Sequence, residues 1–194
     1  MSSYELATAA ETTTELKGKL ILDATCTPAD IAYPTDLGLL NSGREQTEKI
    51  IDILYKPLKK ELKKKPRTYR KRARKDYLAV AKKRKPSSKQ KIKAIKKQLQ
   101  YLKRNLSHIE KLLKQGASLE WLKESTRKKL ETVQEMYHQQ LWMSENEKHS
   151  IAQRIVSLSQ PHVRPIVRGK AGKPVEFGAK ISASYVDGFI FLDR

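Results

Sequence analysis

The sequence predicts an α+β fold that is mostly helical, in which strands from the two ends of the chain share one sheet. Two observations lead to this class. Apolar runs typical of strands occur only near residue 20 and beyond residue 174, whereas the long stretch between them carries helical patterns. A lone strand or hairpin is not stable by itself, so we expect the end strands to pair and the helices to form an insertion between them.

The N-terminal residues are expected to hold a leader and the first strand. Residues 1–17 are polar and rich in Thr, without an apolar period, and are predicted to be a disordered leader. Residues 18–42 should contain the first core strand and a loop. The apolar run at residues 19–25 suits a strand buried on both faces, and Pro28 and Pro34 punctuate the loop that follows.

A basic helical insertion is predicted for residues 43–158. Ser42 lies three residues before Glu45, which is the spacing of a capping box and marks a helix start. Pro57 should kink this helix or end it. A second helical piece is expected between the next two prolines, and its apolar positions are Ala73, Tyr77, Val80 and Ala81.

The strongest periodic signal predicts an antiparallel coiled-coil hairpin over residues 88–158. Its first half repeats apolar residues at alternating spacings of three and four, the heptad pattern of Ile92, Ile95, Leu99, Leu102, Leu106, Ile109 and Leu113. Gly116 and Ser118 then supply a helix stop and a new start. A looser apolar seam that reaches Ile155 should form the returning helix.

Residues 159–194 are predicted to form a β-hairpin of the core. Asp187 and Gly188 stand between two runs rich in β-formers, residues 175–185 and residues 189–192. Asp-Gly between alternating apolar residues is the strongest short signal for a hairpin.

Composition excludes several classes of protein. Cys26 is the only cysteine, which rules out an internal disulfide and favours a reducing compartment. No apolar run approaches the roughly 20 residues that span a bilayer. The N-terminus also lacks the basic-then-apolar order of a signal peptide. We therefore expect a cytoplasmic protein that does not contact a membrane.

Almost all of the surplus positive charge lies in one segment. The net charge is +20, and residues 56–97 contribute +19 of it, because they hold 21 Lys or Arg and only two acids, Glu61 and Asp76. A run of charge is often just a solvated helix face, but this density also attracts a polyanion and releases its counterions. We predict contacts to a nucleic-acid backbone rather than to bases. The candidate DNA-binding residues are Lys63, Lys64, Lys65, Arg67, Arg70, Lys71, Arg72, Arg74, Lys82, Lys83, Arg84 and Lys85.

Asp23 is the single most interesting acid. It closes the first apolar run, and an aspartate there places a carboxylate at the C-terminal edge of a strand, where metal and phosphate sites of mixed sheets collect. A capping or loop-bonding carboxylate is the structural alternative.

Two blocks of sequence resemble a known family. The segments Leu-Ile-Leu-Asp-Ala-Thr, Ala-Asp-Ile-Ala-Tyr-Pro-Thr-Asp-Leu and Leu-Leu-Asn-Ser-Gly-Arg-Glu-Gln-Thr-Glu-Lys, within residues 18–48, resemble the first catalytic block of bacterial insertion-sequence DDE transposases. The tail block, Val-Glu-Phe-Gly-Ala-Lys-Ile-Ser-Ala-Ser-Tyr-Val-Asp-Gly-Phe-Ile-Phe-Leu-Asp, is similar to the next two strands of their ribonuclease H-like core. The resemblance implies a partial ribonuclease H-like sheet, interrupted by the basic insertion.

The resemblance also implies a chemistry. In that family two Asp and one Glu hold two Mg²⁺ ions, which promote DNA cleavage and strand transfer. Only the first acid is matched here, by Asp23, as catalytic and metal-binding residue, and the other two would follow Arg194. The chain is therefore expected to be a transposase fragment that binds DNA and is inactive alone. A further chain that supplies the remaining core is one expected partner, and a second copy of the chain in a homo-oligomer is another. The alternative is a non-catalytic, basic coiled-coil protein that binds nucleic acid.

Overall fold

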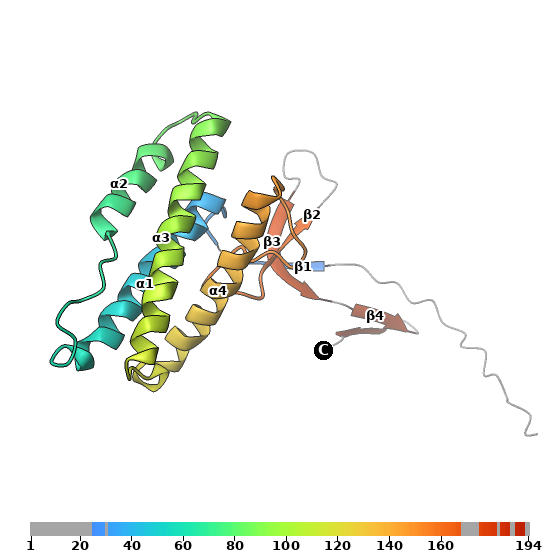
Figure 1. Ribbon diagram of the computed structural model, residues 1–194. Helices are drawn as coiled ribbons and strands as arrows, with labels where there is room; N and C mark the ends of the chain where they lie inside the picture. The colour runs from blue at the N-terminus through green and yellow to red at the C-terminus, as the bar shows by residue number, and fades with distance from the viewer. Residues whose placement is uncertain (1–24, 30, 168–174, 182, 187–188, 193–194) are drawn as a thin grey trace, which may run out of the picture. The chain divides into compact units, whose positions relative to one another are not determined.

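The computed structural model describes residues 25–29, 31–167, 175–181, 183–186 and 189–192 (Figure 1). The chain divides into two compact units. One is Cys26–Lys180, and the other combines Met1–Thr25 with Ile181–Arg194. Asp23 and most of the strand predicted for residues 19–25 lie outside the described residues.

Four α-helices make up most of the described chain: α1 (Asp36–Leu58), α2 (Arg70–Ala81), α3 (Ser88–Lys114) and α4 (Glu124–Glu145). A short 3-10 turn, η1 (Leu119–Trp121), lies between α3 and α4. Helices α1 and α3 run in parallel, while α2 and α4 run the opposite way (Figure 1). The expectation of a mostly helical protein with some strands is confirmed. None of the helices in the described ranges is long and apolar enough to cross a membrane.

The core of the bundle consists of two apolar clusters stacked along α1, α3 and α4. One includes Leu40, Leu102 and Met136, and the other includes Leu54 and Leu112. All five of these side chains are fully buried. Because each cluster takes residues from α1, α3 and α4, the three helices are held together over most of their length.

The heptad pattern predicted that α3 forms a coiled-coil hairpin with the helix that follows it. In the structure, α3 is instead part of a larger bundle. It packs against α1, α2 and α4, and its most extensive interface is with α1. Its buried face is therefore wider than a heptad seam and includes Gln98, Tyr101 and Asn105. The first residue of the predicted seam, Ile92, remains 50% exposed. The antiparallel α3–α4 pair is present as part of a larger bundle.

The predicted helix boundaries need two corrections. Helix α1 begins at Asp36 rather than near Ser42, because the Oγ1 of Thr35 accepts a hydrogen bond from the backbone N–H of Gly38 at 3.1 Å and caps the helix. Helix α4 ends at Glu145 instead of extending toward residue 158. There, the side chain of Asn146 donates to the carbonyl of Trp142 at 2.8 Å, which closes the last turn.

Two smaller expectations about helix ends have different outcomes. Pro57 occupies the last turn of α1, and the helix ends one residue later, as the sequence predicted. Gly116 has a φ of +98° just after α3, in agreement with its expected role as a stop. Ser118, however, caps the 3-10 turn by accepting from the N–H of Glu120, and α4 begins six residues after it.

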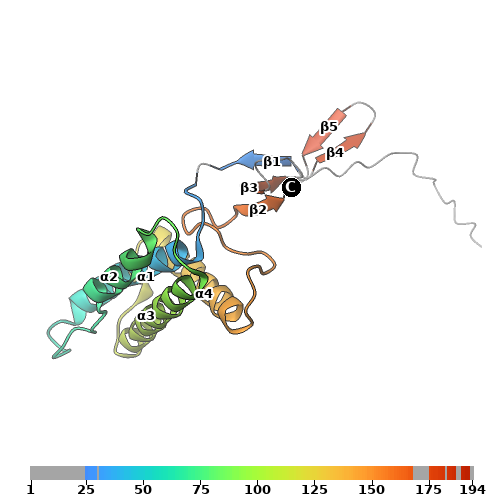
Figure 2. The same cartoon turned by 90° about the horizontal axis from the view of Figure 1, so that it is seen from above.

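A strand near the N-terminus pairs with the tail in a three-stranded sheet, but it overlaps the strand predicted for residues 19–25 only at Thr25. Strand β1 (Thr25–Pro28) lies beside β3 (Val175–Ile181), whose other neighbour is β2 (Arg164–Val167) (Figure 2). The amide of Ala29 donates to the carbonyl of Phe177 at 2.9 Å. Strands β2 and β3 are antiparallel, with Arg164 opposite Gly178.

The predicted hairpin of residues 175–192 is correct only in its second half. Strand β4 (Ala183–Val186) pairs antiparallel with β5 (Phe189–Leu192), and the intervening Asp187-Gly188 lies outside the described residues. Strand β3 instead pairs with β2, a strand that the sequence did not predict. Pro165 argued against a strand here, because proline is uncommon inside sheets. It is tolerated because β2 lies at the edge of this sheet, where proline does occur.

Candidate nucleic-acid interface

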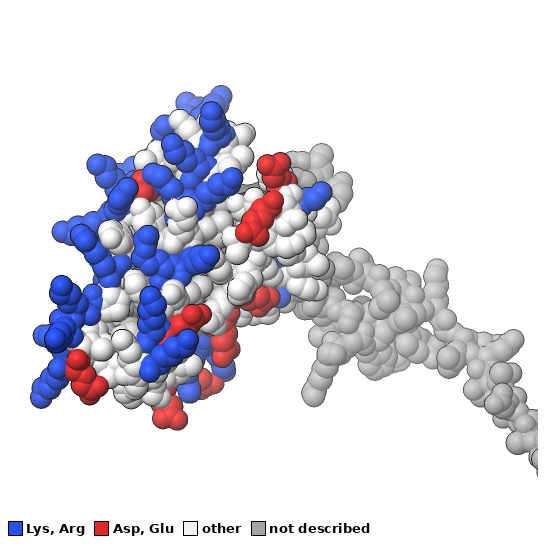
Figure 3. Space-filling view, viewed as in Figure 1, with Lys and Arg blue, Asp and Glu red and all other residues white. Residues whose placement is uncertain are grey.

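Basic side chains gather on the surface over α2, α3 and the connections before and after α2 (Figure 3). We call the part formed by residues 63–85 the basic surface. Its predicted DNA-binding residues lie at three places: the connection that precedes α2, the outward face of α2, and the connection to α3. All twelve are exposed to solvent.

The side chains of nine of the twelve predicted residues form neither a hydrogen bond nor an ion pair with any residue that the structure describes. They are Lys63, Lys64, Lys71, Arg72, Arg74, Lys82, Lys83, Arg84 and Lys85. Asp76 lies near enough to Arg72 to interact with its charge, but the cations of this surface far outnumber the acids, so the basic surface carries a strong local positive potential.

Arg70 and Lys65 differ from these nine residues, because both of their side chains are paired with Asp52 of α1. The guanidinium of Arg70 donates two hydrogen bonds to this carboxylate, at 3.0 and 2.8 Å, and the Nζ of Lys65 lies 2.6 Å from it. Burial raises the pKa of Asp52, but the hydrogen bonds from Arg70 and Lys65 outweigh it and leave this pKa below its ordinary value. These two predicted DNA contacts therefore attach the basic connection to α1.

A second set of polar contacts attaches α2 to α3. The carboxylate of Asp76 accepts hydrogen bonds from the Nζ of Lys97 at 2.9 Å and from the hydroxyl of Tyr101 at 2.8 Å. The side-chain amide of Gln98 donates to the carbonyl of Ala73 at 2.9 Å. Burial raises the pKa of Asp76, but the hydrogen bonds from Lys97 and Tyr101 outweigh the effect of burial and lower this pKa overall. Helix α2 is thus held in place by charged and polar groups on both sides.

Tyr69 stands at the centre of an arginine cluster at the start of α2. The guanidinium carbons of Arg67 and Arg104 each lie 4.8 Å from the centroid of its ring. Arg104 is also 5.7 Å from the centroid of Tyr101. Arg104 belongs to α3 and was missed by the sequence analysis. Its outward heptad position is an ordinary one for a solvated side chain, and nothing in the local sequence indicates that α2 packs beside it.

An open hollow of about 830 Å³ adjoins this cluster. It is lined by residues 64–72, which include Tyr69 and six of the predicted DNA-binding residues. Helix α2 has no acidic residue in its first turn, so its N-terminal N–H groups add to the positive potential there. The arrangement suits an extended anion that follows the surface.

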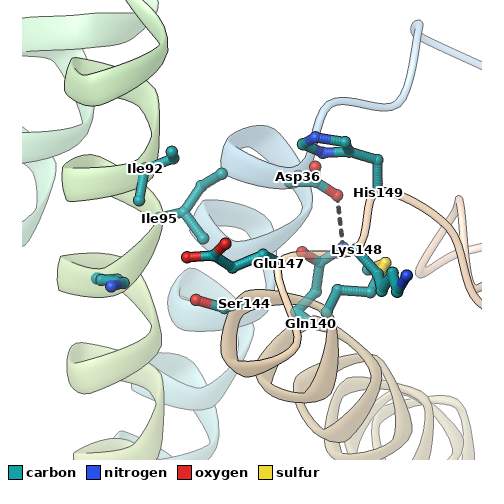
Figure 4. A pocket seen from close by; sticks show the side chains of 10 residues that line it. Asp36, Ile92, Ile95, Gln140, Ser144, Glu147, Lys148 and His149 are labelled. Carbon is teal, nitrogen blue, oxygen red and sulfur yellow. Dashed lines mark hydrogen bonds between the residues drawn. The ribbon is translucent and has the colours of Figure 1, made fainter.

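A smaller pocket of about 310 Å³ lies where α1, α3 and α4 meet (Figure 4). Ile92, Ile95 and Met143 line part of it, and charged groups of both signs surround them. Asp36 points toward Gln140, whose side-chain amide donates to it at 2.8 Å (Figure 4). With mixed charges and an aspartate already hydrogen-bonded, this pocket offers no anion site comparable to the basic surface.

The described part of the chain provides no place for the Mg²⁺ ions that the family resemblance implies. Asp23 lies outside it, and no group of three or more His, Cys, Asp or Glu side chains is positioned to hold a metal ion within it. No step of a reaction is therefore derived through a metal.

Comparisons with protein-family models, with curated proteins and with solved structures gave no match.

Proposed function

We propose that the chain binds DNA through its phosphate backbone, with the basic surface as the contact area. One observation carries this proposal. Nine exposed Lys and Arg side chains on α2 and its two connections form no hydrogen bond or ion pair with the residues described. Each cation that neutralises a phosphate releases a condensed counterion, and this release is the main source of sequence-independent affinity for DNA.

The rigidity of the support adds to this proposal. Arg70, Lys65 and Asp76 use their charges to attach α2 and the connection before it to α1 and α3. The free cations on the same elements are thus displayed at fixed spacing, so less conformational freedom is lost on binding. Side chains arranged along a helix face and its flanking loops would follow a backbone and carry no base readout.

We further propose that this surface is the DNA-holding insertion of a DDE-type transposase with a ribonuclease H-like core. The resemblance of residues 18–48 and of the tail block supports this assignment. So does the pairing of β1 with β3, since it brings the two resembling blocks into one sheet. In this proposal Asp23 is the first of three metal-binding acids, and the chain binds DNA but does not cleave it alone.

Neutralising the outward face of α2 tests the binding surface. We expect the triple variant Lys71→Gln, Arg72→Gln, Arg74→Gln to bind a short DNA duplex at least roughly tenfold more weakly than the wild type, because up to three phosphate contacts are lost. Binding is measured by fluorescence anisotropy at fixed salt.

A matched triple variant on the α4 side of the bundle serves as the control. Lys123→Gln, Lys129→Gln, Lys148→Gln removes the same net charge and should keep nearly wild-type affinity. Equal losses in the two triple variants would show that total charge alone governs binding, and the assignment of the surface would be wrong.

A non-catalytic nucleic-acid-binding protein is the second candidate function. The observation that favours it is the compactness of Cys26–Lys180, whose apolar clusters are filled by the helices and the segment after α4. Incubating the purified chain with DNA and Mg²⁺ separates catalysis from binding alone. We expect no strand cleavage, and metal-dependent cleavage that Asp23→Ala abolishes would contradict both candidates.

A further inference from the structure

We propose that Tyr69 is a positioning residue, which holds Arg67 and Arg104 so that both bind neighbouring phosphates of one DNA strand. This inference rests on the proposed DNA-binding function and adds a specific site to it. Neither Arg104 nor the role of Tyr69 follows from the charge pattern, because the two arginines are far apart in sequence and are brought together by the packing of α2 against α3.

The geometry places two cations close together without a carboxylate between them. Each guanidinium carbon is 4.8 Å from the same ring centroid, so the two carbons lie within twice that distance of each other. Neither Arg67 nor Arg104 forms an ion pair with an acid of the described chain. Like charges repel at this range, and an anion bound to both relieves that repulsion. Two such cations suit consecutive phosphates of a strand.

The contact with the ring leaves the hydrogen-bonding groups of the arginines available. A guanidinium is planar, so it can interact with an aromatic ring through its face while its N–H donors, which lie in its plane, bind phosphate oxygens. The ring also restricts side chains that would otherwise lose much rotamer freedom on binding. Arg70 differs in this respect, since its donors are occupied by Asp52.

Tyr69 is itself fixed by a chain of contacts that leads into α3. Arg104 lies beside both Tyr69 and Tyr101, and the hydroxyl of Tyr101 donates to Asp76 at 2.8 Å. The ring is 38% exposed, so the cluster is accessible from solvent.

The backbone of Tyr69 indicates that this position is not chosen for helix stability. Its φ is 54°, in the left-handed region, which is unfavourable for a bulky residue. It also occupies the N-cap of α2, where its side chain makes no capping hydrogen bond to the described backbone. Asn or Asp would tolerate the left-handed conformation better and would cap the helix, but neither could hold two guanidinium groups.

Replacing Tyr69 by Phe and by Leu tests the inference. Both variants lack a capping group and keep the same backbone requirement, but only Leu removes the aromatic ring. We expect Tyr69→Phe to bind a DNA duplex within about twofold of the wild type. Tyr69→Leu should bind roughly 5- to 20-fold more weakly, because two cation–π contacts are lost. Tyr33→Leu is the control, since this exposed ring packs edge-on against Phe177 and makes no cation–π contact with a described residue, so its loss should not affect binding.

The outcomes separate this inference from the function on which it rests. If the wild type binds DNA with a steep salt dependence and Tyr69→Leu binds equally well, the positioning role is wrong and the basic surface stands. Phe as weak as Leu would also overturn it, because the hydroxyl rather than the ring would be needed. If the wild type fails to bind, the proposed function itself fails.

A second variant keeps the test decisive if Tyr69→Leu does not fold. Arg104→Lys retains the charge but loses the planar group that contacts the ring and can form paired hydrogen bonds to phosphate. We expect it to bind DNA at least about threefold more weakly than the wild type, with an unchanged melting temperature. Wild-type affinity in Arg104→Lys would contradict the proposal.

Discussion

At the scale of single residues, the feature with the largest consequence for stability is a buried ion pair in α1. Arg44 is 1% exposed, and its Nη1 donates to the carboxylate of Glu48 at 2.5 Å while its Nη2 donates to Asn41 at 2.7 Å. Asn105 of α3 completes the polar layer by donating to the hydroxyl of Thr47 at 3.0 Å. Burial raises the pKa of Glu48, and the hydrogen bond from Arg44 opposes this shift. Along α1, the pair lies between the residues that belong to the two apolar clusters.

Removing one partner of this pair should be costly. Glu48→Gln removes the buried counter-charge of Arg44 and leaves only the half-exposed Glu45 paired with it among the described residues. We expect the free energy of unfolding to fall by about 3 to 5 kcal/mol. Urea unfolding followed by circular dichroism measures the change. Glu45→Gln is the control, because Glu45 also contacts Arg44 but is half exposed, and it should cost less than about 1 kcal/mol. Equal effects from the two substitutions would contradict the assigned role of the buried pair.

At the scale of elements, α2 differs from the other helices in what holds it. Within α2, which is described throughout, only Ala73 is fully buried. The helix depends instead on Arg70 with Asp52 on one side and on Asp76 with Lys97 and Tyr101 on the other. Because so little apolar surface is buried, the attachment of α2 should be sensitive to the ionisation of two carboxylates.

This attachment should weaken in acid. The pKa values of Asp52 and Asp76 in the folded protein lie below the ordinary 3.8. At a pH between the lowered and the ordinary pKa, these two carboxylates bind more protons in the unfolded chain than in the folded protein. Their contribution to the stability of the fold is therefore fully present above the ordinary pKa and is lost as the pH falls through the lowered pKa. Unfolding measured from pH 6 to about pH 2.5 should show this loss. Asp52→Asn, Asp76→Asn should reduce the pH dependence in that window, and an unchanged profile would contradict the account of α2.

The sequence predicted elements best where the signal was local. Pro57 marked the end of α1, Asp187-Gly188 marked the β4–β5 hairpin, and the heptad pattern indicated a long helix at α3. Predictions failed where tertiary structure decides. Thr35 rather than Ser42 caps α1, because the burial of Leu39 and Leu40 in the core stabilises the additional helical turns before Ser42.

For the proposed binding surface, too, the sequence predicted the local features but not the contacts that depend on tertiary structure. The run of charge identified the cations of α2 and its connections, but spacing alone could not indicate which of them are already paired. Arg70 is bound by Asp52, 18 residues earlier in the chain, and Arg104 reaches Tyr69 only because α3 packs beside α2. Contacts between residues far apart in sequence depend on packing, so no local pattern reports them.

At the scale of the whole molecule, the residues that stabilise the helical bundle differ from those proposed to bind DNA. Apolar clusters along α1, α3 and α4 hold the bundle together, and the free positive charge is concentrated on α2 and its connections. Substitutions of the free cations should therefore change DNA affinity with little effect on melting temperature.

The salt dependence of DNA binding by the wild-type chain tests the central claim most directly. The dissociation constant for a short duplex is measured from about 50 to 200 mM monovalent salt. With roughly five or more phosphates contacted, the logarithm of the association constant should fall linearly with the logarithm of salt concentration, with a slope of about −4 or steeper. Affinity that does not change with salt would show that the free cations of α2 and its connections do not bind phosphates, and the proposed function would be wrong.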